Sequence, residues 1–543
     1  QDLQKEIDSL KVQLKAIEEK AATAQEFDAR LVKAETKLAG NNIQWGGELR
    51  TRFDGAQEHF KPYNQFMGFM QNTPSASNPY PFAPIAQPVG AQDWTNSVQW
   101  STRLRLNMGI TINEDAKVMG RLVMYKVHGG ADVPTFNGTP NTISTSFTAG
   151  QTPATDALLV ERASLVYHFN SVASILSIGR QNTSDGPPFE VREGGERQAT
   201  PQALAVNAGI DGIGWKFQLD KAGFPEGTLL GFCYGVGYES GFGGGGAVKQ
   251  NQTIVGMNFT NFNGTNPAAI TPVVGNIGPL KDTTVLGVMY DMPLLFQLGD
   301  SVQSANLYLG YNRLGNMTDI PFGNTINFPI PGQTPSTQYV TATANLGDMD
   351  QMTVTWKHKI GDTFTYFVSG GYLKSHPNGQ VSQYGAYWTF PAVMPPGYPT
   401  GLQQLSGFGG LMGDPNKSQT ATAYYVGMRY DPTATFGVGV EFNHGSPRWW
   451  TYTPATGEYT DKLGARGDVW EGYIQWRFAH NASLRLGYID YKYSTAMSGW
   501  QIGPGAQSGQ NWESAMNLGN TPMLQYAYPA TVKNYYASLE VRF

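Results

Sequence analysis

Apolar and polar side chains alternate along most of this chain. In the last twelve residues, 532–543, Tyr535, Leu539 and Phe543 share one face, while Glu540 and Arg542 share the other. A period of two predicts a β-strand with one apolar and one polar side. Similar segments recur from residue 43 onward, so we expect the chain to consist mainly of such strands.

Most of these segments come in pairs that are joined by short turns. We predict the pairs 99–112 with 117–128, 157–169 with 172–180, 211–219 with 228–237, 283–291 with 303–314, 349–360 with 364–376, 420–431 with 435–445, and 468–479 with 482–494. The turns hold Asn, Asp, Gly and Pro, which favour tight reversals. A first strand from residue 43 and the last strand bring the count to 16.

Long polar loops connect one pair to the next. They span 54–98, 129–156, 181–210, 238–282, 315–348, 377–419, 446–467 and 495–531. Loops of this length argue against a compact soluble domain. In a transmembrane β-barrel the long loops lie outside the cell and the short turns lie in the periplasm. An even number of strands then places both the N- and the C-terminus on the periplasmic side.

Composition agrees with a membrane barrel. Lys and Arg number 37 against 42 Asp and Glu, a net charge of -5 that gives no indication of nucleic-acid binding. No run of about 20 apolar residues is present, as a membrane-spanning helix would need. A closed barrel also pairs every backbone group within a bilayer. We therefore predict an all-β fold, a 16-stranded antiparallel transmembrane β-barrel over 43–543, in the outer membrane of a Gram-negative bacterium.

Residues 1–40 differ from the rest and contain no Pro. Leu3, Ile7, Leu10 and Leu14 begin a heptad seam that continues to Leu38. This spacing predicts an N-terminal α-helical coiled coil. The even strand count places the coil in the periplasm. Isoleucine and leucine at both seam positions allow a trimer. The alternative is an amphipathic helix packed on its own barrel.

No constellation of residues indicates catalysis. Cys233 is the single cysteine, which excludes an internal disulfide and a cysteine-based metal or haem site. The histidines are scattered, with no spacing such as His-Glu-x-x-His. We expect no cofactor, no metal and no enzymatic activity. The alternative is a barrel enzyme, such as an outer-membrane phospholipase or protease, although those barrels are generally smaller.

Charged residues on the polar faces of the strands are the candidate functional residues. A charged side chain on the lipid face costs about 2–4 kcal/mol at the membrane midplane, so these residues should face a water-filled lumen. The basic ones are Arg50, Arg52, Arg103, Arg105, Arg121, Arg162, Lys357, Lys359, Arg429, Arg477, Arg485 and Arg542, and the acidic ones are Glu48, Glu441, Glu471 and Glu540. This count predicts a basic lumen wall.

Strand count, alternating turn lengths, terminal Phe543 and the N-terminal coil together resemble 16-stranded outer-membrane porins. The coil is similar to those of phosphate-selective and sugar-selective porins, which are trimers. The segment Gly-Arg-Gln-Asn-Thr-Ser-Asp-Gly-Pro-Pro at 179–188 resembles porin-like proteins of anaerobic, metal-reducing bacteria. The resemblance implies a homotrimer that contacts outer-membrane lipid and lipopolysaccharide. The outer loops are longer than in general porins, and we assign no phosphate-specific arginine ladder.

The third long loop, 181–210, is the candidate constriction. In porins of this type that loop folds inward and narrows the pore. Here it carries Asp185, Glu190, Arg192, Glu193, Glu196 and Arg197. The resemblance therefore implies an acidic loop opposite a basic wall. The alternative is an exposed surface loop.

Taken together, these features indicate a porin that passes ions and small hydrophilic solutes by diffusion, with a weak preference for anions. Two alternatives stay open. One is a structural tether that holds the outer membrane to periplasmic cell-wall material through the coil. The other is a sheath around an electron-transfer cytochrome, which would need a wider barrel.

Overall fold

The computed structural model describes residues 43–71, 82–129, 155–182, 204–238, 252–258, 271–276, 280–298, 301–319, 326–328, 338–340, 342–382, 387–390, 401–404, 410–453, 459–495, 498–499, 501 and 529–543. The predicted coiled coil at 1–40 lies outside these residues.

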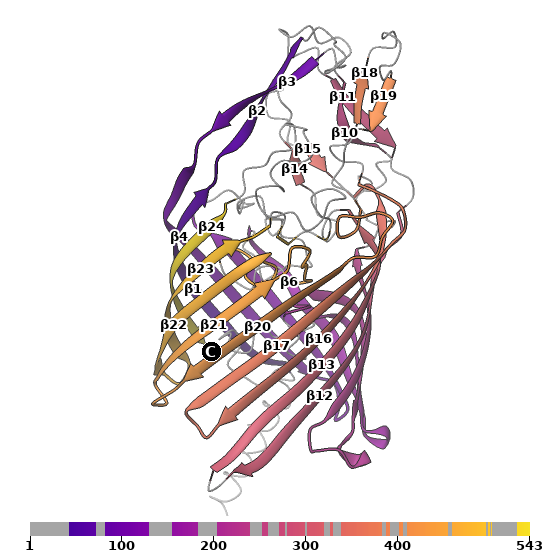
Figure 1. Ribbon diagram of the computed structural model, residues 1–543. Coiled ribbons are helices and arrows are strands. Elements are labelled where there is room, and N and C mark those ends of the chain that lie inside the picture. Colours follow the sequence, from indigo (N-terminus) through magenta and orange to yellow (C-terminus); the bar gives the residue numbers. More distant parts are fainter. Residues whose placement is uncertain are drawn as a thin grey trace, which may run out of the picture.

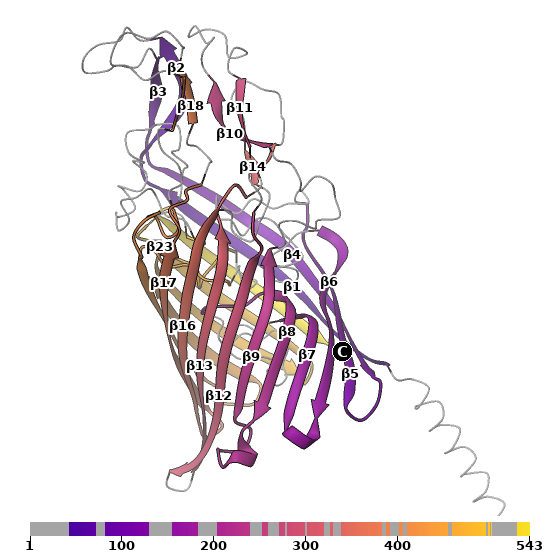
Figure 2. The ribbon, with the colours of Figure 1, turned by 90° about the vertical axis from the view of Figure 1, so that its right-hand side faces the viewer.

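Sixteen antiparallel strands close into one barrel, in the order β1-β24-β23-β22-β21-β20-β17-β16-β13-β12-β9-β8-β7-β6-β5-β4 (Figures 1 and 2). They are β1 (Ile43–Phe60), β4 (Gln92–Thr111), β5 (Ala116–Val127), β6 (Thr155–Phe169), β7 (Ser174–Asn182), β8 (Gly209–Gln218), β9 (Leu229–Tyr238), β12 (Thr283–Leu298), β13 (Ser301–Thr318), β16 (Asn345–Ile360), β17 (Phe364–Pro377), β20 (Thr420–Tyr430), β21 (Phe436–Gly445), β22 (Gly467–Ala479), β23 (Ala482–Tyr493) and β24 (Thr531–Arg542). Pairing of β1 with both β4 and β24 closes the sheet and leaves it no free edge. The predicted 16-stranded barrel is confirmed.

Each strand has an apolar outer face and a polar inner face. On β1, Trp45, Leu49 and Phe53 are exposed on the outside, whereas Arg50 and Arg52 between them are buried. The same alternation runs around the barrel, because side chains of a strand point to opposite faces in turn. The outer face therefore presents the apolar band that a bilayer requires.

Aromatic side chains gather on the outer face near the short turns. Trp476 and Phe478 at the end of β22 are about half exposed, with ring centroids 5.4 Å apart. Trp215 and Phe217 on β8 stack at 5.1 Å. Such rings are suited to the interface between lipid and water, where aromatic residues form girdles.

Two strand pairs extend farther than the sequence predicted. β1 and β4 continue to Phe60 and Gln92, although 54–98 was predicted to be a loop. Likewise, β12 continues to Leu298 rather than ending near residue 291. The β1 and β4 extensions rise beyond the barrel and carry polar residues on both faces, so their alternation is weak (Figure 1).

Short strands from the long loops lie above the barrel at one end (Figures 1 and 2). β2 (Tyr63–Gln71) and β3 (Phe82–Val89) form a hairpin, as do β14 (Ile326–Phe328) and β15 (Gln338–Val340). β10 (Gln252–Asn258), β11 (Thr271–Asn276), β18 (Tyr387–Phe390) and β19 (Gly401–Gln404) form one sheet that joins two long loops. No helix in the described part of the chain is long and apolar enough to cross a membrane.

Candidate functional site

The inner face of the barrel holds the charged residues that the alternation assigned to the lumen. Arg50, Arg52, Arg103, Arg105, Arg121, Glu48, Glu441, Glu471 and Glu540 are buried, Arg162, Lys357, Arg429, Arg477, Arg485 and Arg542 are partly exposed, and Lys359 is exposed. The six residues predicted for the constriction, at 185–197, lie outside the described part of the chain.

Arginines on the wall formed by β1, β4 and β5 are hydrogen-bonded to carboxylates or to a tyrosine hydroxyl. Arg103 is fully buried, and its Nε lies 2.9 Å from Oε1 of Glu48. The Nε of Arg52 donates to Oδ2 of Asp54 at 2.9 Å. The Nη2 of Arg50 donates to the hydroxyl of Tyr125 at 2.9 Å. Burial of a charge is costly unless it is paired and hydrogen-bonded, so these contacts hold the wall in a fixed arrangement.

Glu161 is a lumen carboxylate that the sequence pattern missed. The register of β6 against β5 shifts at this position: Arg121 is opposite Arg162, and Leu122 is opposite Val160. Such a bulge inserts one extra residue, so Glu161 and Arg162 both turn inward. Nε of Arg105 donates to Oε2 of Glu161 at 2.8 Å. Strict alternation would have placed this carboxylate in the lipid, where a charge is unfavourable. That conflict was the sign in the sequence that Glu161 faces the lumen instead.

A second charged cluster joins a long loop to the part of the wall formed by β21, β22 and β23. Glu441 of β21 and Glu471 of β22 are cross-strand partners with buried side chains. Lys462, from the loop between these strands, places its Nζ 2.7 Å from Oε2 of Glu441 and 2.5 Å from Oε2 of Glu471. Arg485 of β23 lies 3.4 Å from Oε1 of Glu471. The loop therefore supplies a cation that neutralises two adjacent wall carboxylates.

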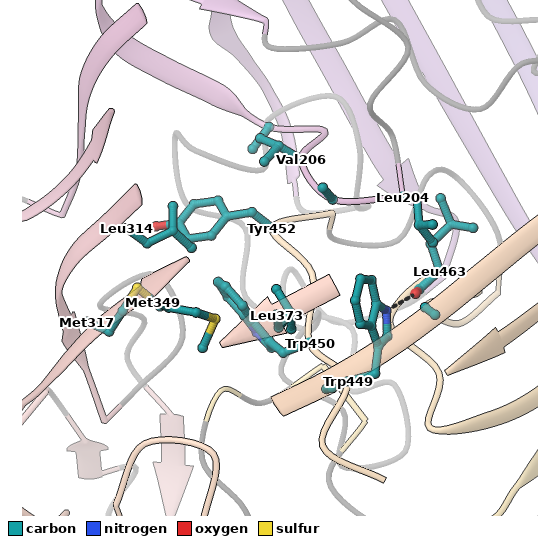
Figure 3. Packing of buried hydrophobic residues seen from close by; sticks show 14 of the residues in the cluster. Leu204, Val206, Leu314, Met317, Met349, Leu373, Trp449, Trp450, Tyr452 and Leu463 are labelled. Carbon is teal, nitrogen blue, oxygen red and sulfur yellow. Dashed lines mark hydrogen bonds between the residues drawn. The ribbon is translucent and has the colours of Figure 1, made fainter. Parts of the chain in front are cut away.

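Apolar side chains of several loops pack inside the barrel. We call Leu204, Ala205, Val206, Leu411, Met412, Trp449, Trp450, Tyr452 and Leu463 the lumen plug; all are buried in one cluster with residues of the wall. Figure 3 shows the tryptophans near Met349 and Leu373. A Cβ added to Gly371 of β17 would lie 2.5 Å from Cη2 of Trp449, so the indole lies directly against the wall.

Hydrogen bonds connect the plug segments to one another and to the wall. The backbone oxygen of Ala205 accepts from Nε2 of Gln351 on β16 at 3.0 Å and from Oγ1 of Thr451 at 2.7 Å. Nε1 of Trp449 donates to the backbone oxygen of Leu463 at 2.9 Å (Figure 3). Nε1 of Trp450 donates to the backbone oxygen of Gly499 at 3.1 Å. The plug is thus a packed element with satisfied polar groups.

Asp319, directly after β13, ties two further loops together at the same end. It is buried, and its carboxylate accepts hydrogen bonds from the backbone of Thr343 at 2.8 Å and from Oγ of Ser382 at 2.8 Å. Burial raises the pKa of this carboxyl above its usual value, although hydrogen bonds oppose the shift.

The lumen is less basic than the sequence count predicted. Asp54, Glu58 and Glu161 are buried on the inner face in addition to the four predicted carboxylates. Several arginines are therefore held in local ion pairs and contribute less to the field in the lumen. Within the described ranges, no group of three or more His, Cys, Asp or Glu side chains could hold a metal ion.

Solved structures of outer-membrane proteins match this chain over most of its length, at low sequence identity. A loop L8 deletion mutant of OmpT from Vibrio cholerae matches with a TM-score of 0.39 and 11% identity, covering 92% of this chain and 99% of that chain. Pseudomonas putida OprB matches with a TM-score of 0.41 and 8% identity, covering 94% of this chain and 96% of that chain. The outer membrane channel DcaP of Acinetobacter baumannii matches with a TM-score of 0.36 and 11% identity, covering 92% of this chain and 97% of that chain. No curated protein matches the chain.

The model of one protein family, described as "Protein of unknown function (DUF3373)", matches residues 93–543. This match includes all barrel strands except β1 and the first residue of β4. The chain therefore belongs to the DUF3373 family.

Proposed function

We propose that this DUF3373 protein forms an outer-membrane channel through which ions and small hydrophilic solutes diffuse. One observation carries the proposal: a closed barrel has an apolar, aromatic outer face and an inner face with charges from most of its strands. An outer face of this kind suits lipid, and a charged inner face suits water. A structural or enzymatic barrel would not need charges distributed around the lumen.

The proposed pathway is narrow on the side of β16 to β22. The lumen plug and the Lys462 cluster reach inward from the long-loop end and contact inner-face residues of β16, β17, β21 and β22. We further propose that loop 181–210 contributes to the constriction. The burial of Leu204 and Val206 at its end supports an inward path for this loop.

We retain a weak anion preference as part of the proposal. Arg105 and Arg103 are close to carboxylates, which reduces their effect, but the basic side chains at the short-turn end are more numerous than the acidic ones. A wall with excess positive charge concentrates anions, most strongly at low salt.

The proposed orientation places the short turns and both ends of the barrel in the periplasm. Ile43 is the first residue of the first barrel strand and Arg542 is the last residue of the last one. Both lie on the side of the barrel that holds the short turns. A coil at 1–40 would then lie in the periplasm, where it is proposed to hold a homotrimer together or to contact cell-wall material. The packed lumen argues against the cytochrome sheath, because the plug occupies space that an enclosed protein would need.

Liposome swelling tests the proposed function. The full chain reconstituted into liposomes should admit small sugars and amino acids at rates that fall steeply as solute size increases. Liposomes with heat-denatured protein are the control for leakage. Swelling no faster than in the control for every solute, including glycine, would contradict the proposal.

A further inference from the structure

A large polar cavity lies at the short-turn end of the lumen, and none of the plug residues lines it. Its volume is about 860 Å³, and it is bounded by β13, β16, β17, β20 and β22 with the turns after β16 and β20. Its charged side chains are Lys357, Lys359, Arg429, Arg477, Asp362 and Asp431. Four cations therefore share the cavity with two carboxylates. We call it the basic vestibule.

Asp431 holds the two arginines of the vestibule. Its Oδ2 accepts from Nε of Arg429 at 2.8 Å, and its Oδ1 accepts from Nη2 of Arg477 at 2.9 Å. A Cβ on Gly437 of β21 would lie 2.2 Å from Oδ1 of Asp431, so this carboxylate lies directly against the wall between β20 and β22. One carboxylate thus fixes two guanidinium groups that come from different strands.

The remaining acidic group neutralises the vestibule only weakly. Nζ of Lys359 lies 3.1 Å from Oδ1 of Asp362, but the Asp362 side chain is 99% exposed and the lysine side chain is 46% exposed. Exposed ion pairs of this kind contribute little stabilising energy, so an incoming anion can compete with Asp362 for the ammonium of Lys359.

Neutral hydrogen-bond donors complete the lining. Ser304 and Asn306 of β13, Thr365 of β17 and Thr433 of the turn after β20 all border the cavity. Hydroxyl and amide groups beside guanidinium and ammonium groups are suited to anionic oxygens. Arg105 and Arg103 are almost wholly buried, whereas the four cations of the vestibule are partly exposed or exposed.

We propose that the basic vestibule binds small solutes with two or more carboxylate or phosphate groups at the short-turn mouth of the channel. This inference rests on the proposed function and names a solute class for it. The cavity is larger than one such anion, so the solute keeps part of its water and can leave again. Conduction needs this balance, because a site must bind strongly enough to admit a solute and weakly enough to release it.

Binding to the detergent-solubilised full chain tests the inference without conduction. Isothermal titration calorimetry with citrate and with tripolyphosphate separates the carboxylate source from the phosphate source. The variant Lys357→Gln with Lys359→Gln should weaken binding of whichever probe binds by at least tenfold. The control variant is Lys492→Gln with Lys533→Gln, which removes two lysines on the outer face of β23 and β24, and it should change the affinity less than twofold. Binding should weaken as salt increases.

Equal affinity in the vestibule variant and the wild type, or no binding of either probe, would overturn the inference. The variant Arg429→Gln with Arg477→Gln gives a second test, because it removes both guanidinium groups of the vestibule; it should also weaken binding. If the protein conducts ions but does not bind either polyanion, the proposed binding site is wrong and the proposed channel function stands. If the protein binds a polyanion in the vestibule but does not conduct ions, the proposed channel function is wrong and the proposed binding site stands.

Discussion

The Nζ atom of Lys462 lies 2.7 Å from a carboxylate oxygen of Glu441, although the lysine belongs to a long loop and the glutamate to the barrel wall. The same ammonium contacts Glu471, the cross-strand partner of Glu441. Like charges directly opposite each other on neighbouring strands repel. The loop between β21 and β22 and the wall beneath it therefore stabilise each other.

Removal of this cation should loosen the loop. In Lys462→Met the two buried glutamates lose this ammonium and keep Arg485 as a nearby cation, and breaking a buried ion pair costs about 3–5 kcal/mol. We expect faster hydrogen exchange at Leu463 and Arg466. The matched control is Lys492→Met, at a lysine whose side chain is 61% exposed, and it should leave exchange unchanged. Unaltered protection at Leu463 in the Lys462 variant would show that apolar packing alone holds the loop.

Trp449→Ala should weaken the plug directly. The indole is fully buried against Gly371 and donates to the backbone of Leu463. Truncation of a buried tryptophan costs about 3–5 kcal/mol. We expect this local loss to appear as faster proteolysis of loop 446–467 while the barrel stays folded. Trp94→Ala, at a tryptophan that is 54% exposed, is the control and should digest like the wild type.

The Arg105–Glu161 ion pair should set charge selectivity as a unit. Arg105→Gln leaves Glu161 in excess, so the reversal potential in a salt gradient should move towards cation selectivity. Glu161→Gln should move it towards anion selectivity, and the double variant should lie near the wild type. Arg180→Gln with Asp211→Asn removes a similar pair, 2.6 Å apart, from the outer face and should change nothing. Identical shifts from both single variants would contradict a role for their charges.

Protection of the loop joined by Asp319 should fall as pH rises. Because the pKa of Asp319 is raised in the folded protein, the folded state binds the proton more tightly than the unfolded state does. Its stabilising contribution is complete below the ordinary pKa of the carboxyl and is lost as pH rises through the raised value. Exchange at Thr343 and Ala344, corrected for intrinsic rates, should therefore show more protection in acid.

Asp319→Asn keeps the side-chain volume without the charge, so it should abolish this pH dependence. Asp414→Asn is the control. The pKa of Asp414 is lowered, because backbone N–H groups of Asn416 and Lys417 donate to its carboxylate, so its contribution has the opposite sign. Equal pH dependence at Thr343 in the wild type and in Asp319→Asn would refute the assignment.

Local patterns were enough to predict the barrel and its inner face. Residues such as Arg50 and Arg103 alternate with lipid-facing neighbours, so the strand itself places them. Glu161 was missed because a bulge changes the alternation by one residue and leaves no local mark except a carboxylate on the wrong face.

The plug could not be predicted from local patterns. Ala205 and Thr451 make a hydrogen bond although they are 246 residues apart. Such contacts exist only because the closed barrel brings the start of β8 and the end of β21 to the same lumen. Trp449 and Trp450 therefore fell within the predicted long polar loop 446–467.

Unitary conductance in planar bilayers tests the central claim, a charged channel narrowed by an inward-folded plug, most directly. The wild-type chain should show discrete steps of constant size. Trp449→Ala and Lys462→Met should give larger steps, because each loosens the loop inside the lumen, and Trp94→Ala should give wild-type steps. Absence of steps in the wild type and in all three variants, with folded barrels present in the membrane, would contradict the account.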